Sequence, residues 1–200
     1  MKRLLAVATA LFAICISASA QDWAKATFQG APQTVLKPVI ENDRVVVRDV
    51  TDFAAVQPFD AVVVSLPSGS VAFLPKGMTH KFAGRLVVID LKDHRVTPIT
   101  NTTGFPLAFP RPGSKKILEN SRVIVWDYTW TPGVATPMHF HDKDVVVVYL
   151  DDGDLKSTTP DGQIVVNLYT FGAVRFNLRN RTHTETLVRG KQRAIITELK

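Results

Sequence analysis

Gly133-Val-Ala-Thr-Pro-Met-His139-Phe-His141-Asp-Lys-Asp144 is the stretch on which the fold depends, and the apolar run 145–150 follows it directly. A run of this length, rich in valine and bounded by aspartates, predicts a β-strand. If the two histidines also lie on a strand, their rings share one face and stand about 7 Å apart along it. Two imidazoles at that spacing can converge on one metal ion.

Other short runs of β-branched residues predict further strands on both sides of this stretch. Clusters of Pro, Gly, Asn and Asp separate these runs, and no segment has the periodicity of an amphipathic helix. An all-β fold follows, built as an antiparallel barrel or sandwich. The predicted strands cover residues 45–47, 61–66, 86–91, 123–126, 145–150 and 193–199.

The chain also matches itself, in the same order, at several places. Residues 41–51 and 119–129 are identical at seven of eleven positions, and residues 60–69 and 144–153 at six of ten. Ordered matches of this kind predict an internal duplication of one β unit. Shorter matches join 69–73 with 172–176, 79–80 with 182–183, and 85–92 with 193–200.

The two copies differ in length around the histidine pair. Between equivalent strands the second copy has six more residues, and these belong to the segment that carries His139 and His141. The first copy also lacks most of the stretch 154–171. We therefore predict a shortened first repeat without metal, and one metal ion per chain in the second.

A third histidine, His183, follows a Gly-x-Val-x-Phe strand pattern, and together these motifs resemble those of the cupin superfamily. The first cupin motif is Gly, five residues, His-x-His, three or four residues, Glu, six residues, Gly, and the second runs from Gly through Pro-x-Gly to His. In the second copy the matching residues are Gly133, His139, His141, Gly153, Gly172 and His183. The first copy matches the second motif at Gly69, Pro75, Gly77 and His80.

The resemblance implies a small antiparallel, jelly-roll-like β-barrel whose motif histidines bind a divalent metal. The ligands would be His139, His141 and His183, and the metal is open among Fe, Zn, Ni, Mn and Cu. Binding should weaken as the pH falls through about 6.5, because protonated imidazole cannot ligate. The predicted organisation is a signal peptide at 1–20, a degenerate N-terminal cupin-like repeat at 21–92, a connector at 93–110 and a metal-binding cupin domain at 111–200.

The sequence departs from the cupin pattern at three positions. The motif glutamate should fall at position 146, which is Val146, and valine cannot ligate. In the second motif Leu178 and Asn180 replace the proline and the glycine, but asparagine tolerates the left-handed conformation that such a turn needs.

The fourth group of the site is open among Glu185, Asp144 and water. Glu185 lies two residues past His183 on the same strand face, so it is the favoured fourth ligand or catalytic general base. Asp144 has a counterpart, Asp60, in the copy without the histidine pair, which indicates a structural role such as turn capping. His80, without a histidine pair in its own copy, is expected not to bind metal.

Two further clusters have alternative explanations. Trp126, Tyr128 and Trp130 form an aromatic stripe that suits packing between sheets or subunits, or else the wall of a substrate pocket. The basic residues near His183 suit either an anion-binding rim or a charged surface strand. They are Arg175, Arg179, Arg181, Arg189, Lys191 and Arg193.

The N-terminus has the layout of a secretory signal peptide. Lys2 and Arg3 precede an apolar run at 4–16, and Ala18-Ser19-Ala20 offers a cleavage site, so the mature chain should begin at Gln21 and be periplasmic or secreted. Cleavage would remove the single cysteine and leave no stable membrane anchor. It would also lower the net charge from +6 to +4, since 22 Lys and Arg then face 18 Asp and Glu. That charge is too weak to indicate nucleic-acid binding.

Three classes of function fit these features. The first is a metal-dependent enzyme of the dioxygenase, isomerase or lyase type that acts on a small molecule. The second is a non-catalytic protein that binds a metal or a small ligand. The third is a structural barrel, for instance in a homodimer, in which the metal only stabilises the fold.

Overall fold

The computed structural model describes residues 38–66, 68–94, 96–97 and 99–200, which fall in one compact unit, Leu36–Lys200. The predicted signal peptide lies outside the described residues. Every regular element within them is a β-strand, and all named strands pair antiparallel, so the predicted all-β antiparallel fold is confirmed. Within the described ranges no helix is long and apolar enough to cross a membrane.

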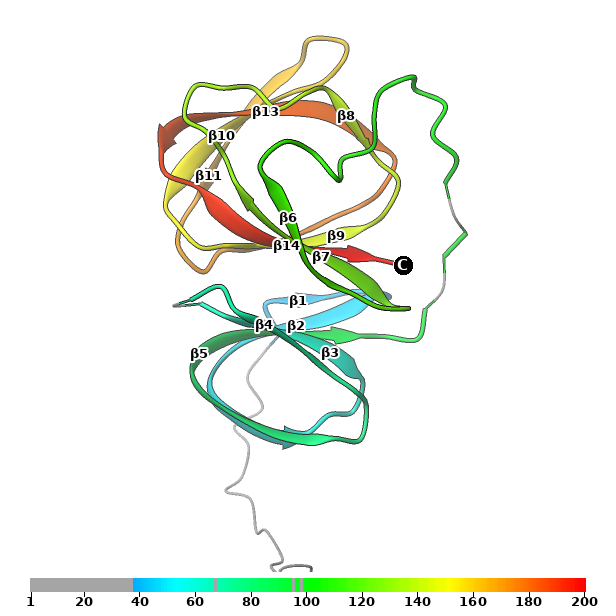
Figure 1. Cartoon of the computed structure of the whole chain (residues 1–200), viewed down its shortest axis with the longest axis vertical. Coiled ribbons are helices and arrows are strands. Elements are labelled where there is room, and N and C mark those ends of the chain that lie inside the picture. Colours follow the sequence, from blue (N-terminus) through cyan, green and yellow to red (C-terminus); the bar gives the residue numbers. More distant parts are fainter. Residues whose placement is uncertain (1–37, 67, 95, 98) are drawn as a thin grey trace, which may run out of the picture. The chain divides into compact units, whose positions relative to one another are not determined.

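The N-terminal strands form one five-stranded sheet in the order β1-β2-β5-β3-β4 (Figure 1). The predicted strands at 45–47, 61–66 and 86–91 all lie in it. A bulge after Thr51 bends β2, and beyond it β2 and β5 continue as a two-stranded ribbon. The strands are β1 (Ile40–Glu41), β2 (Val45–Val56), β3 (Asp60–Ser65), β4 (Val71–Leu74) and β5 (Thr79–Leu91).

The C-terminal strands form a five-stranded sheet, β12-β9-β14-β7-β6, and a four-stranded sheet, β11-β10-β13-β8 (Figure 1). Strands β13 and β14 belong to different sheets and are joined at residues 191–192. The strands are β6 (Ser114–Glu119), β7 (Val123–Thr129), β8 (His139–His141), β9 (Val145–Tyr149), β10 (Gly153–Thr158), β11 (Ile164–Tyr169), β12 (Val174–Asn177), β13 (Arg181–Gly190) and β14 (Arg193–Leu199).

The two five-stranded sheets have the same connectivity. Strands β1, β2, β5, β3 and β4 lie in the same order as β6, β7, β14, β9 and β12. The sequence matches relate β2 to β7, β3 to β9, β4 to β12 and the end of β5 to β14. This shared order is what a duplicated unit predicts; the duplication itself and the proposed domain boundaries stay predictions.

The strand face that is identical in the two copies forms a common core. Val45 and Val47 of β2 lie in one apolar cluster with Val123 and Val125 of β7, and all four are fully buried. Alternate side chains of a strand share a face. The residues that recur at every second position in the two copies therefore lie on the face that packs in this core. Each buried valine contributes about 1.5–3 kcal/mol to folding.

Two equivalent ion pairs join the copies. Arg44 Nη1 donates to Asp144 Oδ2 at 2.7 Å, and Arg122 Nη1 donates to Asp60 Oδ2 at 3.1 Å. Since Arg44 and Arg122 are equivalent in sequence, as are Asp60 and Asp144, each copy donates from its arginine to the aspartate of the other. The Arg44–Asp144 pair is the more deeply buried, with side chains 8% and 4% exposed against 28% and 25% for the other.

The aromatic stripe packs inside the C-terminal barrel. Trp126, Tyr128 and Trp130 are buried in a second apolar cluster formed by strands of both C-terminal sheets. Phe109 stacks on Trp126 with ring centroids 5.2 Å apart. Trp126 Nε1 donates to Glu198 Oε2 at 2.8 Å. The stripe therefore packs within its own barrel rather than between subunits, and Trp130 also lines a cavity.

Candidate metal centre

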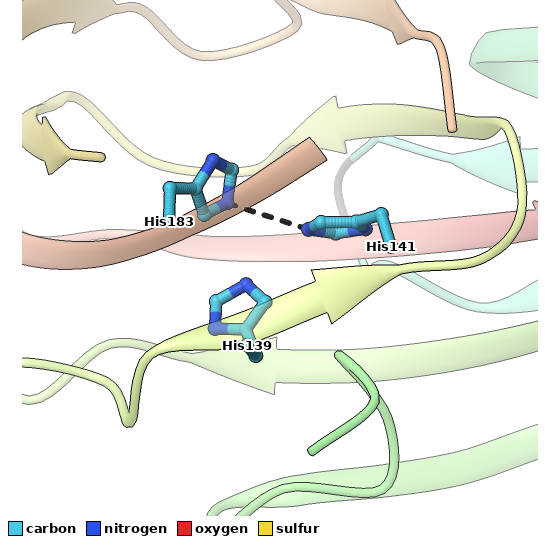
Figure 2. Close-up of side chains that lie close together, drawn as sticks. All are labelled: His139, His141 and His183. Atoms are coloured by element: carbon cyan, nitrogen blue, oxygen red, sulfur yellow. Dashed lines mark hydrogen bonds between the residues drawn. The ribbon is translucent and has the colours of Figure 1, made fainter. Parts of the chain in front are cut away.

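Two neighbouring strands bring the three histidines to one side of the four-stranded sheet. In the antiparallel ladder of β8 and β13, His139 lies opposite His183, and His141 lies opposite Arg181. Residues at every second position of a strand share a face, so Arg181, His183 and Glu185 of β13 lie on the histidine side. Figure 2 shows the three imidazoles turned toward one another from these two strands.

The distances between the imidazoles suit a single metal ion. The ring centroids are 5.0, 4.8 and 5.1 Å apart, and one nitrogen of each ring lies within 4.8 Å of the others. His141 Nε2 lies 3.3 Å from His183 Nε2. Two nitrogens that each lie about 2.0–2.1 Å from one tetrahedral ion are about 3.3–3.4 Å apart. The three buried histidines can therefore hold a metal ion.

The histidines are also in the protonation state that a metal requires. Burial lowers the pKa of His139 to about 4, and the charges of Arg111 and His183 add to the shift. Burial, with Arg181 and Arg111, lowers the pKa of His183 to about 3, and burial takes the pKa of His141 well below its ordinary value. All three rings are thus neutral at pH 7. Protons should compete with a metal at a lower pH than the value of about 6.5 expected from the sequence.

Hydrogen bonds fix the tautomer of His139. Its Nδ1 donates to the carbonyl oxygen of Pro137 at 2.8 Å, which leaves the lone pair on Nε2. Arg111 Nη1 donates to that Nε2 at 3.0 Å. His139 can ligate a metal only if Arg111 releases this hydrogen bond. His141 Nδ1 is buried without a hydrogen-bond partner among the described residues.

Glu185 lies beside the histidines but is engaged by other groups. Trp130 Nε1 donates to Glu185 Oε2 at 3.3 Å, and Arg111 Nη2 lies 3.5 Å from the same oxygen. The other oxygen, Oε1, lies 4.0 Å from His183 Nε2. Glu185 is therefore placed to accept or give a proton within the site, although its role stays a prediction.

Asp144 has the structural role that its counterpart in the first copy indicates. Its Oδ1 accepts a hydrogen bond from the backbone N–H of Arg179 at 2.8 Å, and its Oδ2 accepts one from Arg44 at 2.7 Å. Both carboxylate oxygens are thus used away from the histidines. The backbone bond to Arg179 is a loop cap of the predicted kind, and Asp60 caps Lys76 in the same way at 2.9 Å.

Position 146, where the motif predicts a glutamate, does not face the histidines. Val146 packs in the core cluster between the five-stranded sheets, whereas Val145 and Val147 line the cavity beside the histidines. A shift of one residue moves a strand side chain to the opposite face, so position 145 is the one that faces the site. Both positions hold valine, and β9 supplies no ligand. Asn180 adopts the predicted left-handed conformation, with φ 62°.

The described residues of the first copy form no equivalent histidine cluster. In the ribbon of β2 and β5, Ala55 lies opposite His80, as His139 lies opposite His183 in the second copy. His80 stacks on Phe82 with ring centroids 6.1 Å apart. Among the described residues, the histidine triad is the single cluster with metal-ligand spacing, and it does not include His80.

A cavity of about 200 Å³ opens beside the triad. Its walls include Trp130, Tyr149 and Phe176 as well as His141 and His183. Arg111, which the sequence did not indicate, lies behind the histidines with its guanidinium 4.1 Å from the Tyr128 ring centroid. Arg111 precedes the first strand of the second copy in a loop, where no periodic pattern marks a residue as inward-facing. The other polar lining residues are Ser157, Asn167, Arg175, Asn177, Arg181 and Glu185.

No protein-family model matches the chain. A beta-alanine degradation protein, BauB, of Pseudomonas aeruginosa is 44% identical over 45 residues, which are 22% of this chain and 47% of the relative, so the match spans less than half of that protein.

Two solved structures with similar folds are both described as cupin proteins. A cupin domain from Bordetella pertussis is 28% identical, with a TM-score of 0.40, and the match covers 46% of this chain and 99% of that domain. A cupin 2 conserved barrel domain protein from Leptotrichia buccalis is 12% identical, with a TM-score of 0.47, over 82% of this chain and 88% of that one.

Proposed function

We propose that this chain, with its cupin-type motifs and fold, is an exported protein that binds one divalent metal ion through His139, His141 and His183. The metal would interact with a small molecule that binds in the adjoining cavity. The observation that carries the proposal is the convergence of three buried, neutral imidazoles from two strands at ligand distances. Three imidazoles suit Zn, Fe, Ni, Mn or Cu, and the Irving–Williams order favours the later metals.

The cavity favours a ligand-binding site over a metal that only stabilises the fold. A purely structural site is usually closed by a fourth protein ligand, whereas here β9 lines the cavity with Val145, Val147 and Tyr149 and offers no carboxylate or histidine. A metal held by three imidazoles keeps open positions at which it can polarise a bound oxygen as a Lewis acid. His139, His141 and His183 would hold the ion, and Glu185 would accept or give a proton beside it. The preferred class is a metal-dependent enzyme of the dioxygenase, isomerase or lyase type; a non-catalytic binding protein is the alternative.

Glu185→Ala separates a ligand role from an acid–base role for this carboxylate. We expect zinc affinity to fall by no more than about 10–100-fold, as for a group that only supports a ligand, because Trp130 and Arg111 already engage one of its oxygens. Where a substrate is turned over, the rate should fall about 10²–10⁴-fold, as for loss of a general acid or base. Equilibrium dialysis with Zn²⁺ measures the first effect. Loss of zinc as complete as in a histidine variant would make Glu185 a ligand.

The export part of the proposal rests on the N-terminal sequence. We expect the protein recovered from the periplasm or the medium to begin at Gln21. N-terminal sequencing of the mature protein measures this directly. Retention of Lys2 would contradict export by a cleaved signal peptide.

The mature protein is further proposed to act without nucleic acid or a membrane anchor, and a homodimer is its proposed assembly. An apolar stripe on the edge strand β11 supports the homodimer. Ile164, Val166 and Leu168 lie on one face of that strand and are 60%, 47% and 68% exposed. An exposed apolar edge strand is a common site of strand pairing with a second chain.

A further inference from the structure

We propose that the cavity beside the three histidines binds a small organic carboxylate, whose anionic group is received by Arg181. The inference rests on the proposed function, because it assigns a class of ligand to the proposed metal site and its cavity. It is carried by the charges of the cavity walls, by the pairing of each arginine and by the size and lining of the space.

The cavity walls carry a clear excess of positive charge. Three arginines line it, Arg111, Arg175 and Arg181, against the single carboxylate of Glu185. A bound divalent cation would add two more positive charges. A ligand that completes this site must therefore bring negative charge.

Arg175 and Arg181 are the lining arginines that form no ion pair with a carboxylate of the described residues. Arg175 is exposed and its guanidinium lies 5.7 Å from the Tyr169 ring centroid, so Arg181 is the partly buried arginine without a counterion. Its Nε donates to the carbonyl oxygen of Leu178 at 2.6 Å, and no carboxylate of the described residues forms an ion pair with it. It lies opposite His141 in the ladder of β8 and β13, on the face of the sheet that carries the histidines. Its side chain is partly buried. Partly buried guanidinium groups are normally paired with an anion.

Arg111 is engaged in a different way and is not the proposed receptor. It lies 3.5 Å from Glu185 and donates to His139, and its side chain is 5% exposed. Its guanidinium also lies over the rings of Phe109 and Tyr128, 4.7 and 4.1 Å from their centroids. These contacts hold Arg111 behind the histidines.

The remaining walls suit a compact apolar or aromatic body. Trp130, Tyr149 and Phe176 line the space with Val145 and Val147. The volume of about 200 Å³ is below the roughly 300 Å³ at which drug-sized sites begin, so the ligand is small. A carboxylate on a single ring or a short chain fits both the charge and the size.

The two copies of the chain support the assignment. On β13, Arg181 and Glu185 flank His183 at two residues on either side. The equivalent positions around His80 are Met78 and Phe82, which carry no charge. The arginine and the carboxylate thus occur in the copy that has the histidine pair, as groups of a binding site would.

Titration calorimetry with Zn²⁺-loaded full-length protein tests the proposal. The probes are benzoate and succinate, with benzamide as the neutral analogue of benzoate and inorganic phosphate as the alternative anion. We expect at least one carboxylate to bind with a Kd below about 1 mM, and benzamide and phosphate at least about tenfold more weakly. Equal binding of benzoate and benzamide, stronger binding of phosphate, or no carboxylate binding in this range would overturn the proposal.

Arg181→Gln and Arg189→Gln form the matched pair of variants. Both remove one positive charge from β13, but Arg189 is exposed and paired with Asp154 outside the cavity. Carboxylate affinity should fall at least about tenfold in Arg181→Gln, with unchanged zinc stoichiometry, and stay at the parent value in Arg189→Gln. An equal effect of the two variants would overturn the assignment of Arg181. Carboxylate binding in protein that takes up no zinc would support this inference while contradicting the proposed metal function.

Discussion

The double variant His139→Ala, His141→Ala should lose metal binding while it stays folded. The variant removes two of the three imidazoles, and only His183 remains at the site. Loss of a group that merely supports a ligand costs about 10–100-fold in metal affinity, so loss of two ligands should cost well over 100-fold. The fold should persist because neither the common core nor the second apolar cluster includes these side chains. Equilibrium dialysis against Zn²⁺, followed by elemental analysis, measures the effect.

His80→Ala is the matched control for that experiment. His80 occupies the position of His183 in the first copy but lies opposite an alanine instead of a histidine. Its removal should leave one metal ion per chain. A stoichiometry of two that falls to one in His80→Ala would mean that the first copy also binds metal.

Asp144→Ala should be strongly destabilising. The substitution leaves Arg44 buried without its partner and removes the acceptor for the N–H of Arg179. Breaking a buried ion pair from one side costs about 3–5 kcal/mol of unfolding free energy. Asp60→Ala breaks the equivalent but more exposed pair with Arg122 and should cost about 1 kcal/mol or less.

Urea unfolding of the two aspartate variants measures this difference. Because Asp144 does not face the histidines, Asp144→Ala should also keep its metal under conditions in which it is folded. Equal destabilisation by the two substitutions would contradict the burial difference between the pairs. Loss of metal from folded Asp144→Ala would make Asp144 the fourth ligand.

The histidine triad could be predicted because its signals are local. His-x-His has the period of a strand, and His183 ends a strand pattern that the first copy repeats. The common core could also be predicted from the sequence, since Val45 and Val47 recur as Val123 and Val125. In both cases the two-residue period of a strand fixes which side chains point together.

The features that were missed depend on loops and on register. Residues 142–144 bend the chain between β8 and β9, and spacing counted along the sequence did not show that Val145 rather than Val146 faces the site. Arg111 reaches His139 from a loop, so its role follows from tertiary contacts alone. Strand β11 was not predicted, because it has apolar residues on both faces and little alternation.

The most direct test of the account is the position of the metal in crystals of the Zn²⁺-loaded protein, located by anomalous scattering at the zinc edge. The account predicts one peak per chain, about 2.0–2.1 Å from a nitrogen of each of His139, His141 and His183, with Arg111 displaced from His139 Nε2. A peak elsewhere, or an undisturbed Arg111–His139 hydrogen bond with no metal at the triad, would contradict it.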